Sequence, residues 1–382
     1  DPLFYDLFDQ VVQWCDELEI YLILDNHSSG DAGTVTDPGI GAVLLKIWNQ
    51  VALHYSTSSP FLLYEILNEP HDIDNDIWNT AQQEVLTAIR EIDNTHIIIL
   101  SPSDWDDFRN LDSMYEYDGD KLLYTFHFYE PHLFISQGMA NSNFSTASGV
   151  PFPYSPEDMP PCPAEYLGTW KEQFWQVYSV MGTVDSVINL MSLITDFVAE
   201  RQVAVFCGEY GSMMTTCPPD DRIFWYQTLR NAFEERNIPW LIWDYHSTMG
   251  IFTRGDYYGL FDHDLNIPLL EALGFNVPAQ TPLLITPDNE GFPIYQDYVS
   301  PLMRERSYTS GTLNFYSTED PAEGAYCIKW SGAAAYNSMV LAFNPFKDMS
   351  WLAANGYFLS MWVKGNDPGN SLQVRFQDTK TA

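Results

Sequence analysis

Two glutamates lie where a carboxylate could take part in chemistry. Glu69 follows the apolar run 61–67, and Glu209 follows the apolar run 203–207. If both runs are strands of one parallel sheet, their carboxyl ends meet at one face, which is the active face of β/α barrels. Two carboxyl groups that converge there could cleave a glycosidic bond: a protonated one supplies a proton to the leaving oxygen, and an ionised one attacks the anomeric carbon. Either glutamate alone could instead cap a helix or form a salt bridge.

Four more side chains share this position at or just past the end of an apolar run: His27, His127, Tyr129 and Trp243. A single histidine at such a position is more often a structural hydrogen-bond donor, but the four together favour a binding site beside the glutamates. Trp243 offers a flat apolar face on which a pyranose ring can stack. Asn68 directly precedes Glu69 and can hydrogen-bond a sugar hydroxyl, and Trp105 is a candidate for a second sugar platform.

The elements that must position these residues alternate along the first part of the chain. Short apolar runs predict strands at 21–24, 61–67, 96–100, 122–127, 203–207 and 240–243. Apolar residues at helical spacing predict helices over 43–51, 77–92, 187–200 and 222–235. This alternation predicts an α/β fold with a parallel sheet covered by helices, and a repeat of roughly 30 residues is typical of the (β/α)8 TIM barrel. The segment 138–181, rich in Pro, Ser and aromatic residues, predicts a long loop insertion on one face.

The composition changes near residue 274, where a second domain is expected. We expect a catalytic barrel over 1–274, a Pro- and Gly-rich linker over 275–291, and an all-β sandwich over 292–382. Short alternating segments separated by turn residues predict strands of this sandwich at 313–315, 325–330, 339–342, 358–362 and 372–376.

Charge and composition exclude several classes of protein. The chain carries 52 acidic and 17 basic residues, a formal net charge of −35, which would repel nucleic acid and anionic membranes. No apolar run approaches the ~18–20 residues that span a bilayer, so we expect no membrane insertion. Residues 1–14 predict part of an amphipathic helix rather than a signal peptide. The five cysteines lack the spacing of a zinc site, and Cys162 and Cys217 could be a disulfide or two buried thiols.

The runs LILDNH, YEILNEP, TFHFYEP, VFCGEYG and LIWDYH, in this order, resemble glycoside hydrolase family 5, the large cellulase family of clan A. The resemblance covers residues 3–274 and implies a retaining double displacement without a metal cofactor. Glu69 then matches the acid/base and Glu209 the nucleophile. The residues that match the family's substrate-contacting positions are His27, Asn68, His127, Tyr129 and Trp243.

The sequence departs from the family pattern in one respect. The family carries an arginine on the second barrel strand, which braces the nucleophile, whereas the first arginine here is Arg90. Because the run 21–24 matches the third strand, we expect a barrel that lacks its first two βα units in this chain. The segment 292–382 is similar to the jelly-roll modules of bacterial polysaccharide hydrolases, which can bind carbohydrate, and we expect it to be C-terminally incomplete.

These features together predict a secreted, monomeric endo-β-1,4-glucanase that acts on a β-linked polysaccharide. A β-mannanase or another β-glucanase is an alternative, because loops such as 138–181 choose the polysaccharide. A non-catalytic glycan-binding protein is a further hypothesis, which the absent arginine favours and the two glutamates oppose. A metal-dependent hydrolase built around Asp25 and His27 is the least favoured.

Overall fold

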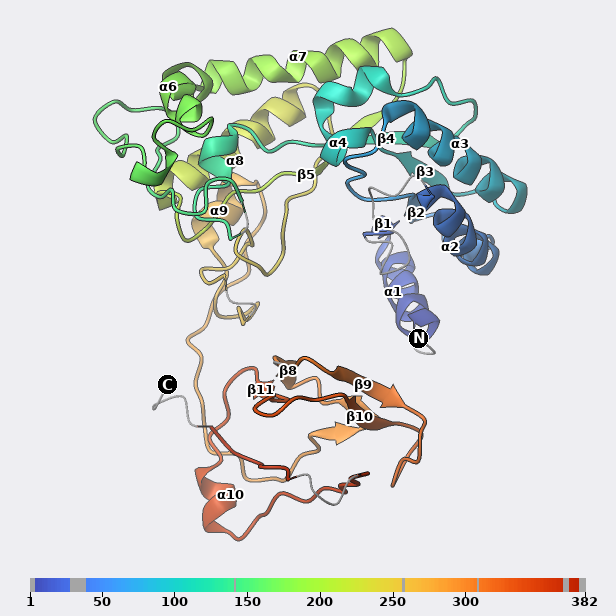
Figure 1. Ribbon diagram of the computed structural model, residues 1–382, viewed down its shortest axis with the longest axis vertical. Helices are drawn as coiled ribbons and strands as arrows, with labels where there is room; N and C mark the ends of the chain where they lie inside the picture. The colour runs from blue at the N-terminus through green and yellow to red at the C-terminus, as the bar shows by residue number, and fades with distance from the viewer. Residues whose placement is uncertain are drawn as a thin grey trace. The chain divides into compact units, whose positions relative to one another are not determined.

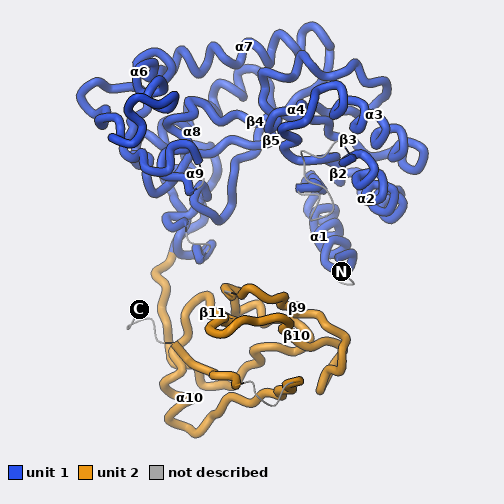
Figure 2. The backbone as a smooth tube through the Cα atoms, in the orientation of Figure 1, with its two compact units in different colours: residues 1–280 blue, residues 281–382 orange. Residues whose placement is uncertain are grey.

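The computed structural model describes residues 4–27, 39–140, 142–255, 258–307, 309–366 and 371–377. The chain divides into two compact units, residues 1–280 and 281–382, shown in different colours in Figure 2. The division falls inside the segment 275–291, which the sequence predicts to be a linker.

The first unit is built on a five-stranded parallel sheet whose strands follow one another in chain order (Figure 1). Its strands are β1 (Leu22–Asp25), β2 (Leu62–Glu65), β3 (Ile97–Leu100), β4 (Leu122–His127) and β5 (Val205–Glu209). All four neighbouring pairs are parallel, so every strand ends at the same edge. Five of the six strands predicted for this region are confirmed.

The sixth predicted strand, over 240–243, is wrong. Its backbone forms one parallel bridge between Trp240 and Cys207 and two hydrogen bonds, from Leu241 N–H to Cys207 and from Trp243 N–H to Tyr210. Leu241 and Trp243 are 48% and 36% exposed, because this segment runs beside β5 without a described neighbour on its other side. It therefore follows the sheet edge without joining the ladder, but it still brings Trp243 to the carboxyl ends of the strands.

Helices in the first unit follow the predicted alternation. The longer ones are α1 (Phe4–Leu18), α2 (Ile40–Tyr55), α3 (Asn75–Ile92), α7 (Val184–Arg201) and α8 (Pro219–Glu235). Asp74 caps α3 by accepting hydrogen bonds from two backbone N–H groups, and Pro219 occupies the first turn of α8, where no N–H partner is needed. The faces of α2 and α3 bury large side chains such as Trp48 and Trp78, whereas α1 buries only Val12 among its described residues.

The segment 138–181 is more ordered than the predicted loop insertion. It contains η3 (Ala164–Tyr166) and α6 (Glu172–Met181). Its aromatic residues pack inward, since Phe144, Phe152 and Tyr166 are all buried. These rings therefore belong to the main hydrophobic core of the first unit.

Within the described residues, no single helix is long and apolar enough to cross a bilayer. Only α6 and α7 taken together meet that length and composition, and they are bent by 88° at their junction.

All five cysteines are free thiols, so Cys162 and Cys217 form no disulfide.

The second unit consists of short antiparallel pairs. β9 (Thr312–Ser317) pairs with β10 (Cys327–Ser331), β8 (Met303–Glu305) with β11 (Leu341–Phe343), and β6 (Tyr295–Gln296) with β7 (Tyr298–Val299). A short helix, α10 (Ser350–Ala354), follows. The predicted strands at 358–362 and 372–376 are wrong: Phe358 and Trp362 are 87% and 77% exposed, because no described layer covers them.

Candidate active site

β4 and β5 end side by side and bring His127 and Glu209 together. The two residues are register partners at the last position of each strand. Gly208 permits this approach, since a Cβ there would lie 2.4 Å from Thr125 Oγ1 and 3.4 Å from His127 Nε2. Tyr129 comes two residues after His127, so the alternation of an extended chain points both side chains to the same face.

Glu69 lies on the turn after β2. Its φ of +48° is in the left-handed region, which non-glycine residues rarely adopt. The turn is held from outside, because the Glu69 N–H donates to Asp106 Oδ2 at 3.0 Å and Trp105 N–H donates to the Pro70 carbonyl at 3.1 Å. The backbone that carries Glu69 is therefore fixed by the loop that follows β3.

The two predicted glutamates face each other across His127. His127 Nδ1 lies 2.9 Å from Glu69 Oε1 and 3.5 Å from Glu209 Oε2. Tyr129 donates its hydroxyl hydrogen to Glu209 Oε2 at 2.8 Å. One oxygen of each glutamate and one nitrogen of His127 all lie within 4.8 Å of one another. The distance between these two carboxylate oxygens is shorter than the roughly 6.5–9.5 Å at which inverting glycosidases admit a water molecule beside the sugar.

Burial and neighbouring charges set the protonation of this group. Burial raises the pKa of Glu209, while the charge of His127 and the hydrogen bond from Tyr129 oppose the rise. Burial lowers the pKa of His127, but the hydrogen bond to Glu69 and the charges of Asp106 and Glu209 prevail and bring it to about 10. His127 is therefore an imidazolium near neutral pH.

Two buried carboxyl groups that the sequence analysis did not single out lie beneath the site. Asp106 has no exposed side-chain surface, and burial raises its pKa to about 7 against the opposing charge of His127. Burial, followed by the charges of Asp25 and Asp106, also raises the pKa of Glu65 well above its ordinary value. Glu65 could have been predicted from the sequence as a buried acid, because it lies inside the apolar run 61–67.

Aromatic rings line the rim of the site. His27 and Trp243 stack in parallel, with ring centroids 5.3 Å apart and an interplanar angle of 1°. A hydrogen bond to Asp25 raises the pKa of His27, against the effect of burial. Trp105 is half-exposed and stacks on His71 at 3.5 Å.

The predicted site residues thus form two connected groups and two neighbours of Glu69. Glu69, His127, Tyr129 and Glu209 are joined by direct contacts, as the previous distances show. His27 and Trp243 pair with each other, and the charge of His27 acts on Glu209. Trp105 joins the turn of Glu69 through its backbone. Asn68 is buried beside Glu69, and its backbone N–H donates to Asn26.

Glu69, His127 and Glu209 together have the compactness of a metal site. A neutral imidazole could offer a lone pair to a metal ion, whereas an imidazolium has N–H groups on both nitrogens and could not.

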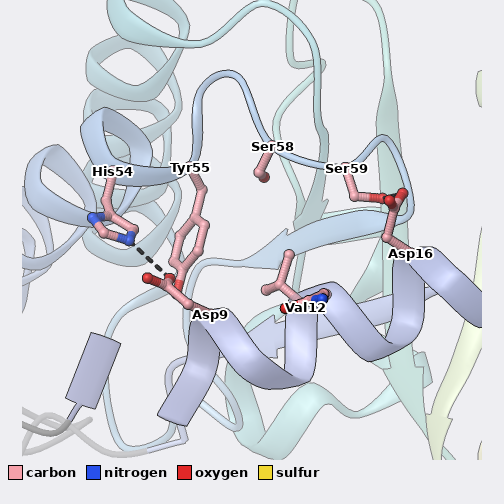
Figure 3. A pocket seen from close by; sticks show the side chains of 8 residues that line it. Asp9, Val12, Asp16, His54, Tyr55, Ser58 and Ser59 are labelled. Carbon is pink, nitrogen blue, oxygen red and sulfur yellow. Dashed lines mark hydrogen bonds and ion pairs between the residues drawn. The ribbon is translucent and has the colours of Figure 1, made fainter. Parts of the chain in front are cut away.

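The pocket drawn in Figure 3 lies apart from these residues, between α1 and the end of α2. It has a volume of about 340 Å³ and is lined by Asp9, Val12, Gln13, Asp16, His54, Tyr55, Ser58 and Ser59. His54 Nε2 and Asp9 Oδ1 lie 2.8 Å apart at its edge. None of the predicted site residues lines this pocket.

Solved structures define the fold class as an α/β fold of TIM-barrel type. Cel5A of Thermotoga maritima in complex with cellobiose has a TM-score of 0.58 and 23% identity, covering 71% of this chain and 78% of that one. The same protein has been solved with mannotriose. The cellulose synthase subunit Z of Clostridioides difficile has a TM-score of 0.58 and 22% identity, covering 72% of this chain and 80% of that one.

Sequence comparison identifies the family. Residues 1–248 match the model of cellulase (glycosyl hydrolase family 5), so the chain belongs to this family. Endoglucanase 3 of Fibrobacter succinogenes is 25% identical over 280 residues, covering 70% of this chain and 43% of that protein. Endoglucanase C of Acetivibrio thermocellus is 28% identical over 255 residues, covering 62% of this chain and 71% of that protein. The chain thus spans less than half the length of the Fibrobacter relative.

Proposed function

We propose that this protein is a retaining endo-β-1,4-glucanase with Glu69 as acid/base and Glu209 as nucleophile. The observation that carries the proposal is the spacing of their carboxylate oxygens within 4.8 Å. Retaining enzymes place the two carboxyl groups about 5–5.5 Å apart, whereas inverting enzymes need about 6.5–9.5 Å to admit a water molecule. The endoglucanase relatives support a β-1,4-glucan as substrate.

In the first step, Glu209 attacks the anomeric carbon while Glu69 gives its proton to the leaving oxygen. The bond from sugar to leaving oxygen breaks, and an ester between the sugar and Glu209 forms. The Tyr129 hydroxyl and the charge of His127 hold Glu209 ionised for the attack. In the second step, Glu69 takes a proton from water, which attacks the same carbon and releases Glu209.

The rim rings extend the site for a polymer. Trp243, stacked on His27, and Trp105, stacked on His71, each present an aromatic face that suits the apolar face of a pyranose. Asn68 is proposed to hydrogen-bond a sugar hydroxyl beside Glu69. Because the Thermotoga protein has been solved with mannotriose, β-mannan is tested as an alternative substrate, together with β-glucans other than β-1,4-glucan.

The test compares Glu69→Gln and Glu209→Gln with the parent on soluble β-1,4-glucan, mannan and xyloglucan. We expect each change to lower kcat at least a thousand-fold, which corresponds to about 4 kcal/mol of barrier. On an aryl cellobioside with an acidic leaving group, Glu69→Gln should recover activity, because departure then needs no proton, and Glu209→Gln should not. Glu84→Gln, on the exposed side of α3, is the matched control.

Three outcomes would contradict the proposal. Near-normal turnover by Glu209→Gln would show that Glu209 is not the nucleophile. A product of inverted stereochemistry, measured by NMR, would rule out double displacement. Loss of parent activity in chelator would favour the metal-dependent alternative. Binding of glucan without any hydrolysis would favour the glycan-binding alternative.

Two finer points of fold accompany this function as proposals. We assign β1 to β5 and the bridge at Trp240 to the third to eighth strands of a (β/α)8 barrel, and residues 281–382 to a module of jelly-roll type. A place outside the cell, where polymeric glucan occurs, stays a prediction.

A further inference from the structure

We propose that Asp106 is a positioning residue of this site, which holds the backbone of Glu69 and the ring of His127 in their working arrangement. Its side chain is completely buried, and one oxygen serves both partners. Oδ2 accepts the Glu69 N–H at 3.0 Å and lies 3.6 Å from His127 Nε2. The other oxygen is buried and has no hydrogen-bond partner among the described residues. This inference rests on the proposed function and deepens it.

The backbone around Asp106 is strained. Asp104, Trp105 and Asp106 have consecutive φ values of 64°, 66° and 54°. Each such residue costs on the order of 1 kcal/mol or more, and strain of this kind gathers at functional sites. Glu69 is left-handed too, and the two strained turns are joined by hydrogen bonds in both directions. Asp106 thus links the turn after β3 to the one that carries the acid/base.

The imidazole of His127 lies between two carboxyl groups. Nδ1 faces Glu69 and Nε2 faces Asp106. A carboxyl oxygen can accept a hydrogen bond whether the group is ionised or protonated, so an imidazolium can donate from Nδ1 to Glu69 while its Nε2–H faces Asp106 at 3.6 Å, an ion-pair distance. The charge of Asp106 therefore favours the imidazolium, and its position fixes the ring plane that aims Nδ1 at Glu69.

Several other titratable groups act on this ring and must be considered with Asp106. Glu65 and Glu69 come from β2 and its turn, Glu209 comes from β5, and Tyr129 meets the ring edge-on from its own segment. From the end of β1, the charge of Asp25 acts on Glu65 and that of His27 on Glu209. Asp106 is the group that faces Nε2.

Two substitutions separate the position of the Asp106 side chain from its charge. Asp106→Asn keeps the shape, the oxygen that accepts the Glu69 N–H and the tolerance for left-handed φ, but it removes the charge. Asp106→Ala removes the acceptor as well. Asp104→Asn is the matched control, because Asp104 is an exposed residue of the same left-handed turn.

The protein is measured in two ways. Rates on an aryl β-cellobioside are recorded from pH 4 to 11, and the His127 imidazole is titrated by 15N NMR over the same range without substrate. Its signal is identified by its loss in His127→Gln. Thermal melts confirm that each variant is folded.

We expect Asp106→Asn to melt no lower than the parent, since it removes a buried charge. Near pH 5 its kcat should stay within about threefold of the parent, because burial already keeps Asp106 largely protonated there. Above pH 7 its kcat/KM should fall earlier, and His127 should titrate about one pH unit lower, because one of three facing carboxylates is neutral. Asp106→Ala should lose about 10- to 100-fold in kcat across the whole range, with KM within about twofold.

An unchanged His127 titration in Asp106→Asn, or a parent-like kcat in Asp106→Ala, would overturn the proposal. So would equal effects in Asp104→Asn, which would make the turn itself responsible. The NMR titration needs no turnover, so it tests Asp106 even if Glu69→Gln and Glu209→Gln show that the proposed function is wrong.

Discussion

The charge of His127 and the hydroxyl of Tyr129 both lower the pKa of the proposed nucleophile, Glu209, against the effect of burial. Glu209 is largely buried, and burial raises its pKa, yet it must be ionised to attack a sugar. The Tyr129 hydroxyl donates to it at 2.8 Å and offsets part of that rise. A hydrogen bond to a charged group contributes about 1.5–3 kcal/mol.

Replacing Tyr129 with phenylalanine should shift the acid limb of the pH–rate profile to higher pH. Without the donor, the protonated form of Glu209 gains relative to the ionised form, so its pKa rises further. At the optimum, kcat should fall by about 10- to 100-fold, in line with one lost charge-assisted hydrogen bond. The measurement is kcat/KM against pH, and Tyr245→Phe, an exposed tyrosine, is the control. An acid limb that stays in place would show that Tyr129 does not tune Glu209.

The glutamate pair could be predicted from sequence because each member follows an apolar run, and strand ends of a parallel sheet converge. Asp106 could not, although the neighbouring Trp105 was singled out. Its partner Glu69 is 37 residues away, and the three left-handed residues that turn it inward leave no local signature, since Asp is common in turns of every kind. Such contacts between two loops arise from tertiary structure.

At the scale of elements, the apolar runs in the sequence predict the five strands of the sheet, but they do not predict where the sheet ends beside β5. β2 to β5 are short apolar runs that are buried for most of their length, as is typical of parallel strands, whereas β1 is mostly half-buried. The segment 240–243 has the same composition, but a ladder needs consecutive bridges, and within this segment only Trp240 forms one. The strands predicted at 358–362 and 372–376 are wrong for a related reason. Alternation predicts a strand with one covered face, and no described layer covers these residues.

Helix α3 begins at Asn75, a short segment after the turn that carries Glu69, and Asp74 caps it. The Asp74 side chain accepts hydrogen bonds from the N–H groups of Asp76 and Ile77. Asp74→Ala should lower the free energy of unfolding by about 1 kcal/mol, the usual contribution of such a cap. Chemical denaturation measures the change, with the exposed Glu84→Ala as control. Equal midpoints for Asp74→Ala and the parent would mean that the cap adds nothing.

At the scale of the whole molecule, the first residues of the second unit form no helix or strand and have apolar side chains in solvent. Leu283, Leu284 and Ile285 are 42%, 82% and 46% exposed, and no helix or strand contains them. Thermolysin, which cleaves before large apolar residues, should cut there first and release a fragment that retains residues 1–280. Mass spectrometry identifies the cut, and Leu284→Asp should slow it. A first cut within 138–181 would show that this insertion opens more readily than the junction.

The pair of interlocked turns, 68–70 and 104–106, also bears on how relatives of this protein can be recombined. Each turn depends on the other for a hydrogen-bond partner, although about 35 residues and the whole of α3 separate them. If one turn is replaced by that of a homologue and the other is kept, both turns can lose their hydrogen-bond partners. The two turns form a single cassette, and directed evolution that treats them as one unit should yield more functional chimeras than exchange of either alone.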